Sequence, residues 1–209
     1  MTAFLLIRHA LCDPVGKAIA GRAAGVHLNP VGQDQAERLA LRLENLAIRA
    51  VYSSPLERAI ETAGPFARRK GLSVQVAPGL NEIDFGDWTG RTLAELEQLP
   101  GWRAFNTFRS GTRIPGGEMA AEVLTRASRE IERLRAAHPS PTDIVALVSH
   151  GDVIRAVVAH ALGSPPDLFQ RIELSPASVS VLLVDTYGSR VLLLNSTGDW
   201  PAELLAGSR

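Results

Sequence analysis

The sequence predicts an α/β protein, a three-layer sandwich with a mostly parallel central sheet, helices on both faces and a small lid. Three observations support this fold class. Apolar runs of strand length alternate with segments in which apolar residues recur at helical spacing. Two of these runs end abruptly in a histidine. The chain has 209 residues and a 45% hydrophobic composition, enough for one substantial core, so we expect a single domain over 1–209.

The first predicted strand, residues 4–7, ends in Arg8 and His9. A second apolar run begins at residue 144 and ends in His150, and helical spacing starts at once after it. In open α/β sheets, ligands bind beyond the carboxyl ends of the strands, so both histidines are expected at one edge of the sheet. A helix N-terminus beside His150 favours an anion there. The two strand ends therefore predict an anion site.

Between these strands the pattern gives a loop over 16–26, followed by a helix with Asn29 as N-cap and Pro30 at its first position. Apolar residues along one face carry that helix to about Leu46. A short strand over 48–52 follows. The next helix opens at residues 53–55.

A third strand is predicted over 72–77, and a long helix over 118–137. The segment between them, about 81–117, is polar and rich in glycine at its start. It then becomes helical over 92–108, with a break at Pro100. We interpret 81–117 as a lid-like insertion beside the strand ends.

The C-terminal part is predicted to add strands over 172–174, 179–184 and 191–194, with a turn at Tyr187 and Gly188 joining the last two.

Composition excludes several classes of protein. The formal net charge is zero, so no overall field draws the chain to nucleic acid or to anionic membranes. No apolar run reaches the length of a membrane span. The one cysteine, Cys12, excludes an internal disulfide and disfavours a cysteine-ligated zinc site. The first strand starts too early for a signal peptide, so a cytoplasmic location is expected.

Five segments, in order from about residue 4 to residue 163, resemble motifs of the histidine phosphatase superfamily (phosphoglycerate mutase-like), phosphatase branch. The segments are Arg8-His9, residues 53–63 (SSPLERAIETA), residues 80–90 (LNEIDFGDWTG), residues 115–118 (PGGE) and residues 148–151 (VSHG).

The resemblance implies that His9 is the nucleophile and forms a covalent phosphohistidine. It implies that Arg8 and Arg58 clamp the phosphoryl oxygens and that His150, catalytic and phosphate-binding, completes the pocket. Glu82 matches the general acid, which then serves as base for water. Asp84, two residues on, competes for that role. No metal and no other cofactor is implied, and the expected partner is a small phosphorylated metabolite.

Three positions depart from the family pattern. Ala10 stands where the family has glycine, although its N–H is expected to reach phosphate if φ permits. Cys12 replaces a hydroxyl residue, and a thiol is the weaker donor. Val15 replaces an asparagine. Cys12 and Arg22, with Lys17 beside them in the first loop, are candidate substrate contacts, and Trp88 and Trp102 are candidates for the lid pocket.

The implied activity is therefore metal-independent hydrolysis of a phosphomonoester. Two alternatives stay open: a mutase-type phosphotransferase, and a degenerate member that binds a phosphorylated ligand without turnover. The loop after Glu82 resembles phosphatases rather than mutases, and mere binding would need no proton donor. The sequence fixes neither the ester nor the oligomeric state, and a homodimer is compatible with it.

Overall fold

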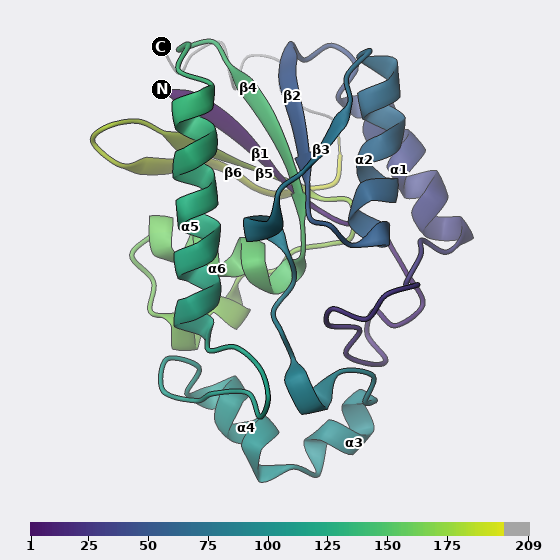
Figure 1. Cartoon of the computed structure of the whole chain (residues 1–209), viewed down its shortest axis with the longest axis vertical. Helices are drawn as coiled ribbons and strands as arrows, with labels where there is room; N and C mark the ends of the chain where they lie inside the picture. The colour runs from purple at the N-terminus through teal and green to yellow at the C-terminus, as the bar shows by residue number, and fades with distance from the viewer. Residues whose placement is uncertain (199–209) are drawn as a thin grey trace.

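A six-stranded mixed sheet runs through residues 1–198, the part of the chain that this computed structural model describes, in the order β3-β2-β4-β1-β5-β6 (Figure 1). The strands are β1 (Thr2–Arg8), β2 (Ile48–Ser53), β3 (Val74–Val76), β4 (Ile144–Ser149), β5 (Val179–Val184) and β6 (Ser189–Ser196). Strands β3, β2, β4 and β1 are parallel, whereas β5 runs antiparallel to both of its neighbours. The predicted, mostly parallel sheet is confirmed.

The strand register aligns the ends of the central strands. Arg8 lies opposite Ser149, and Ser53 lies opposite Val148. The residues that follow β1, β2 and β4 therefore emerge together at one edge of the sheet, as the two strand-end histidines predicted.

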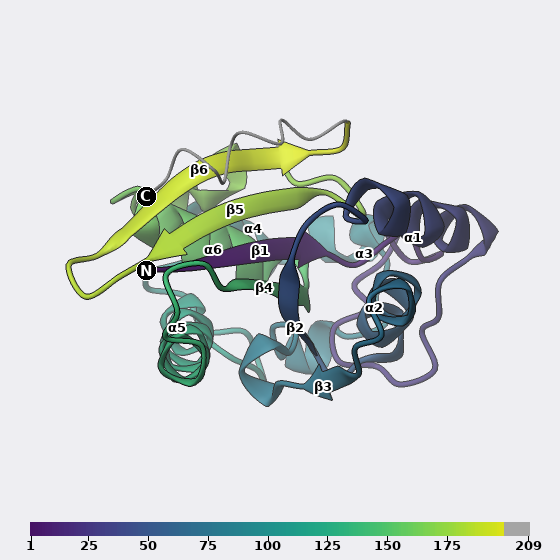
Figure 2. The same cartoon turned by 90° about the horizontal axis from the view of Figure 1, so that it is seen from above.

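Helices cover both faces of the sheet, as expected (Figure 2). The first pair is α1 (Pro30–Arg42) and α2 (Glu57–Arg69), and the second is α5 (Ala120–Ala137) and α6 (Gly151–Ala161). Along β1 the buried side chains alternate between the two cores. Leu5 and Ile7 pack with α1 and α2, whereas Phe4 and Leu6 join the cluster beneath α5 and α6.

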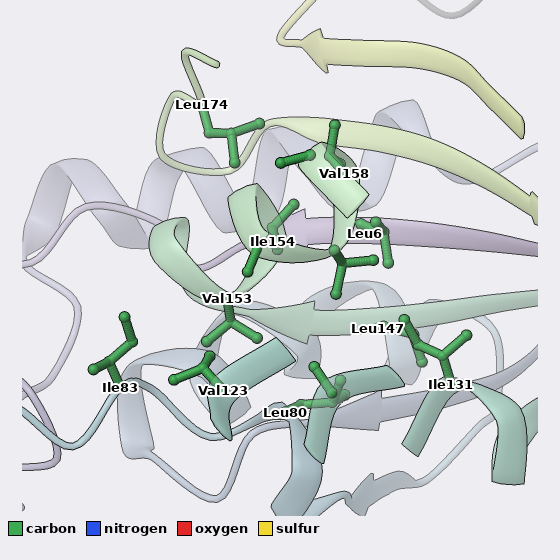
Figure 3. Close-up of a cluster of buried hydrophobic side chains, with 14 of the residues drawn as sticks. Leu6, Leu80, Ile83, Val123, Ile131, Leu147, Val153, Ile154, Val158 and Leu174 are labelled. Carbon is green, nitrogen blue, oxygen red and sulfur yellow. The ribbon is translucent and has the colours of Figure 1, made fainter. Parts of the chain in front are cut away.

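Figure 3 shows part of this second cluster, where Leu6 and Leu147 of the sheet lie near side chains of α6 and α5. Val153 of α6 and Val123 of α5 extend the same contact toward Ile83, in the loop after β3. The core thus continues from the sheet to the loop that carries Glu82.

Local sequence sets the helix ends. Asn29 caps α1, since its side chain accepts from the Gly32 N–H, and Pro30 occupies the first position as predicted. The helix ends at Arg42, a turn earlier than the apolar pattern suggested. Leu43 is fully buried as its C-cap, and the chain then turns toward β2. The next helix also differs from the prediction, since it starts at Glu57, after its N-cap Leu56, rather than at residues 53–55.

The segment 81–117 lies beyond the strand ends, at the bottom of Figure 1. After η1 (Pro78–Leu80), it contains η2 (Gly86–Trp88), α3 (Leu93–Glu97) and α4 (Pro100–Thr107), and the predicted break at Pro100 is confirmed. Trp88, Trp102 and Phe105 pack against one another in edge-to-face and tilted contacts, with ring centroids 5.4–6.2 Å apart. The tryptophans thus form the small core of this segment.

The strand predicted over 172–174 is wrong. A 3₁₀ helix, η3 (Pro166–Arg171), precedes these residues, and they pair with none of the strands in residues 1–198. Ile172 and Leu174 are buried, which explains the apolar pattern. Their carbonyls accept from Arg155 Nε and Arg8 Nη1, so arginine side chains use the groups that a sheet would otherwise pair. The β5–β6 hairpin with its turn at Tyr187 and Gly188 is as predicted.

Within residues 1–198, no helix is both long enough and apolar enough to cross a bilayer. The domain predicted over 1–209 also includes 199–209, which lie outside the described residues.

Candidate active site

A cavity of about 160 Å³ opens at the carboxyl ends of β1 and β4. Arg8 and His9 reach it from the end of β1, Arg58 from the first turn of α2, and Glu82 from the loop after η1. His150 is fully buried beside it, and its ring centroid lies 5.2 Å from that of His9. The structure therefore brings together the five residues with predicted catalytic or phosphate-binding roles.

His9 is buried and held in one tautomer. Its Nδ1 lies 2.7 Å from the Ala10 carbonyl oxygen, which can only accept, so Nδ1 carries the hydrogen. Nε2 then keeps its lone pair. Burial, followed by the positive charges of Arg58 and Arg8, lowers the pKa of His9 to about 3. The ring is therefore neutral at physiological pH and has a free electron pair.

Arg8 and Arg58 provide positive charge at the cavity, Arg8 half-buried and Arg58 fully buried. Arg58 is 1% exposed, and its Nη2 donates to the Gly21 carbonyl at 2.8 Å. Within residues 1–198, its Nε and Nη1 have no hydrogen-bond partner, and neither has Arg8 Nε. Buried guanidinium N–H groups without a carboxylate partner suit a phosphate group, whose oxygens accept two hydrogen bonds from one arginine.

His150 is oriented by two residues of the motif that follows β2. Its Nε2 lies 2.7 Å from Ser54 Oγ, and its Nδ1 lies 3.4 Å from Arg58 Nη2. Burial, and then the charges of His9 and the nearby arginines, hold the pKa of His150 well below its usual value. Gly151 starts α6 directly after it. A Cβ at Gly151 would lie 3.3 Å from Arg8 Nε, so glycine lets the guanidinium lie against the helix N-terminus.

Glu82 shares the cavity with these cations, whereas Asp84 does not. The Glu82 side chain is 13% exposed, its Oε1 accepts from the Ile83 N–H, and its Oε2 lies 3.7 Å from His150 Nδ1. Burial, and then the negative charge of Asp152, raises the pKa of Glu82 to about 7. The Asp84 side chain is 42% exposed and accepts from the Gly86 N–H and from Arg22. Geometry thus favours Glu82 over Asp84 as the acid.

Arg22 lies behind the acid-bearing loop. Its Nε donates to the Glu82 carbonyl oxygen at 2.8 Å, and Arg126 Nη2 donates to the same oxygen at 3.0 Å. Both arginines also pair with Glu118, at 3.0 Å. Arg22 is not among the residues that line the cavity, so its predicted contact with substrate stays a prediction. Ser149 anchors the loop as well, since its Oγ donates to the Leu80 carbonyl.

The three departures from the family pattern fall into two kinds. Cys12 and Val15 line the cavity, and the predicted contact of Cys12 with substrate stays a prediction. The expectation for Ala10 is wrong: its N–H donates to Thr62 Oγ1 at 2.9 Å and is not available to phosphate. Its φ lies outside the left-handed region and its methyl is buried, so no glycine is needed here.

Sequence reasoning missed several supporting residues. Asp152 lines the cavity and accepts from Arg155 at 2.9 Å and from Arg109 at 3.4 Å. The Arg109 guanidinium lies between the rings of Phe105 and Phe169, 4.1 and 4.2 Å from their centroids. Asp152 directly follows His150 and Gly151, and this position could have marked it as a site residue. Arg109 lies in a loop, and no pattern in the sequence marked it.

No three His, Cys, Asp or Glu side chains gather in a metal-binding arrangement within the described 198 residues.

Comparison with known proteins agrees with this geometry. The family model described as "Histidine phosphatase superfamily (branch 1)" matches residues 4–197. A protein described as bifunctional from Mycobacterium tuberculosis is 35% identical over 94% of this chain, although the chain spans only 54% of that relative. Phosphoserine phosphatase 1 of Hydrogenobacter thermophilus is 32% identical, with 94% of this chain and 93% of the relative covered.

Solved structures show the same likeness. A mycobacterial glucosyl-3-phosphoglycerate phosphatase in complex with VO3 superposes with a TM-score of 0.85 at 30% identity, covering 94% of this chain and all of that one. An alpha-ribazole phosphatase from Shigella flexneri superposes with a TM-score of 0.84 at 26% identity, covering 96% of this chain and 99% of that one. The family model spans nearly all of the described chain, and Arg8, His9, Arg58 and Glu82 line one cavity, with His150 buried beside it. The chain is a member of the histidine phosphatase superfamily.

Proposed function

We propose that this chain is a metal-independent phosphomonoesterase that acts on a small phosphorylated metabolite through a phosphohistidine at His9. The observation that carries the proposal is the state of His9. It is a neutral imidazole whose Nδ1 is held by a carbonyl and whose Nε2 keeps its electron pair, close to Arg8 and the buried Arg58. The proposal includes a cytoplasmic location.

In the first step, His9 Nε2 attacks phosphorus and the P–O bond to the alcohol breaks. The alcohol oxygen takes the proton of Glu82, whose raised pKa keeps part of the carboxyl protonated near neutral pH. Arg8, Arg58 and His150 stabilise the charge that spreads over the other phosphoryl oxygens.

In the second step, the ionised Glu82 takes a proton from water. The resulting nucleophile attacks phosphorus and breaks the P–N bond, which releases phosphate and restores neutral His9. Both steps use positive charge that the protein itself supplies, so no metal ion is assigned to them.

Hydrolysis of p-nitrophenyl phosphate with and without EDTA, together with His9→Ala, tests the proposal. EDTA is expected to leave the rate unchanged, and a metal-restored loss would overturn the metal-independent mechanism. A phosphate-labelled substrate should mark the wild type with an acid-labile, base-stable label. His9→Ala should lose both label and turnover, whereas His160→Ala, a matched change on the exposed end of α6, should keep both.

A label that survives acid, or that persists in His9→Ala, would refute the assignment of His9. Phosphate binding without any turnover in the wild type would instead support the degenerate, ligand-binding alternative. Transfer of phosphate between two sugar or glycerate hydroxyls without net release would support a mutase.

A further inference from the structure

The cavity has two chemically different halves. The cations, His9 and Glu82 form one half. In the other half, most of the lining side chains are apolar and come from the first loop, the acid-bearing loop and α3. These side chains are Pro14, Val15, Ala18, Ile19, Phe85 and Leu93. If phosphate occupies the first half, the alcohol part of the ester must lie against this apolar wall.

Backbone pairing between the first loop and the lid holds the wall in place. Ala18 forms an antiparallel bridge with Thr92, the N-cap of α3. Ile19 donates to the Arg91 carbonyl and accepts from Gly90, at 2.9 and 2.8 Å. Ile19 and Leu93 also pack against the main core. The wall is therefore preformed, which lowers the entropy cost of binding an apolar group.

Two other charged groups of the cavity already take part in ion pairs, in which Arg155 contacts Asp152 and Glu173 and Asp152 also contacts Arg109. Asp152 and Arg155 line the cavity, but Arg155 Nη1 donates to Asp152 Oδ1 at 2.9 Å and Arg155 Nε donates to the Ile172 carbonyl at 2.8 Å. The second Asp152 oxygen faces Arg109 at 3.4 Å. Among the described residues that line the cavity, the remaining cations are Arg8 and Arg58, which belong to the phosphate half. Lys17 is exposed and is not a lining residue.

We propose, on the basis of the function proposed above, that this site selects phosphomonoesters whose alcohol is uncharged and apolar beside the ester oxygen. It discriminates against alcohols that carry a carboxylate or a second phosphate. An anion placed against the wall would lose hydration without gaining a cation, whereas an apolar body would bury surface there. Cys12 and Val15 line the same cavity and fit this selectivity, since both replace more polar residues of the family pattern.

The test compares two esters that differ by one charge, benzyl phosphate and 4-carboxybenzyl phosphate. For the wild type, kcat/KM is expected to be at least about tenfold higher for the uncharged ester, because carboxylate desolvation disfavours the second. Comparable or faster hydrolysis of the carboxylate ester would overturn the inference and leave the proposed phosphomonoesterase intact. Hydrolysis of neither ester, nor of p-nitrophenyl phosphate, would instead count against the proposed function itself.

Three variants sharpen the result. Ile19→Lys adds an ammonium group to the wall and should reverse or abolish the preference, whereas Ile19→Met, of similar length but uncharged, should keep it. Lys17→Ala should leave the ratio unchanged. A selective loss of the carboxylate ester in Lys17→Ala would show that Lys17 binds anions and would overturn the inference. The ratio of kcat/KM for the two esters in the wild type tests the inference even if a wall variant fails to fold.

Discussion

Replacing Glu82 by Gln removes the proposed proton donor while keeping the shape of the side chain. Protonation matters most when the leaving alcohol is basic, as in an alkyl phosphate, and least for p-nitrophenolate, which leaves largely unaided. We therefore expect Glu82→Gln to slow an alkyl phosphate by roughly 10²–10⁴-fold at low pH, and p-nitrophenyl phosphate far less.

The pKa of Glu82 sets how this loss varies with pH. Burial raises that pKa to about 7, so the active acid form is lost as pH rises through about 7. A group with this pKa is about nine-tenths protonated at about pH 6 and about one-hundredth protonated at about pH 9. The ratio of wild-type to Glu82→Gln kcat/KM on the alkyl ester should therefore shrink by about ninetyfold across this range.

The assay is phosphate release from an alkyl phosphate and p-nitrophenol release from its aryl counterpart, each measured from about pH 6 to about pH 9. Dividing wild-type by variant rates on one substrate cancels the ionisation of the substrate. Asp84→Asn is the matched control, because Asp84 bonds Arg22 and the Gly86 N–H outside the cavity. A ratio that does not change with pH, or equal losses on both substrates, would refute the assignment of Glu82. A larger pH-dependent loss in Asp84→Asn would transfer the role to Asp84.

Three further substitutions test the surroundings of the site. Cys12→Thr places a hydroxyl donor at the cavity and should raise kcat/KM by about tenfold, since a hydrogen bond to a charged group contributes roughly 1.5–3 kcal/mol. Lower activity on every ester tested would show instead that the thiol suits this pocket. Ala10→Gly should leave kcat/KM unchanged and lower the free energy of unfolding by roughly 1 kcal/mol in a denaturant titration, because the Ala10 methyl is buried and its N–H already bonds Thr62; a gain in activity would contradict this. In the pH profile of kcat/KM on the alkyl phosphate, Asp152→Asn should move the alkaline limb to lower pH, since the charge of Asp152 raises the pKa of Glu82. A limb at unchanged pH would show that burial alone sets that pKa.

The strand ends could be predicted because the sequence signal there is local. Arg8, His9 and His150 directly follow apolar runs, and the parallel register brings such ends together in any open α/β sheet. The roles of Arg58 and Glu82 were predicted only from the resemblance to the family, because nothing in the sequence around them distinguishes them from solvated charges.

Other features depended on long-range contacts that no local pattern encodes. Ile172 and Leu174 flank an exposed Glu173 as in a half-buried strand, but arginine side chains from elsewhere in the chain occupy the carbonyls of these two residues. The contact between Arg22 and the Glu82 carbonyl likewise joins segments 60 residues apart. The partner of the Ala10 N–H, Thr62, required the position of α2 relative to β1. In each case the partner was set by packing rather than by neighbouring residues.

The order of strands in the sheet has a consequence for the timing of folding. Strand β1, which leads directly into His9, lies between β4 and β5, two strands that follow it by most of the described chain. During synthesis at roughly 5–20 residues per second, β1 therefore waits on the order of ten seconds for its first neighbour. His9 cannot take up its position beside His150 before β4 has been made and paired. A nascent chain thus gains the proposed phosphate site late. Phosphate binding that appears during translation would then show that β4 has paired with β1 in the central sheet.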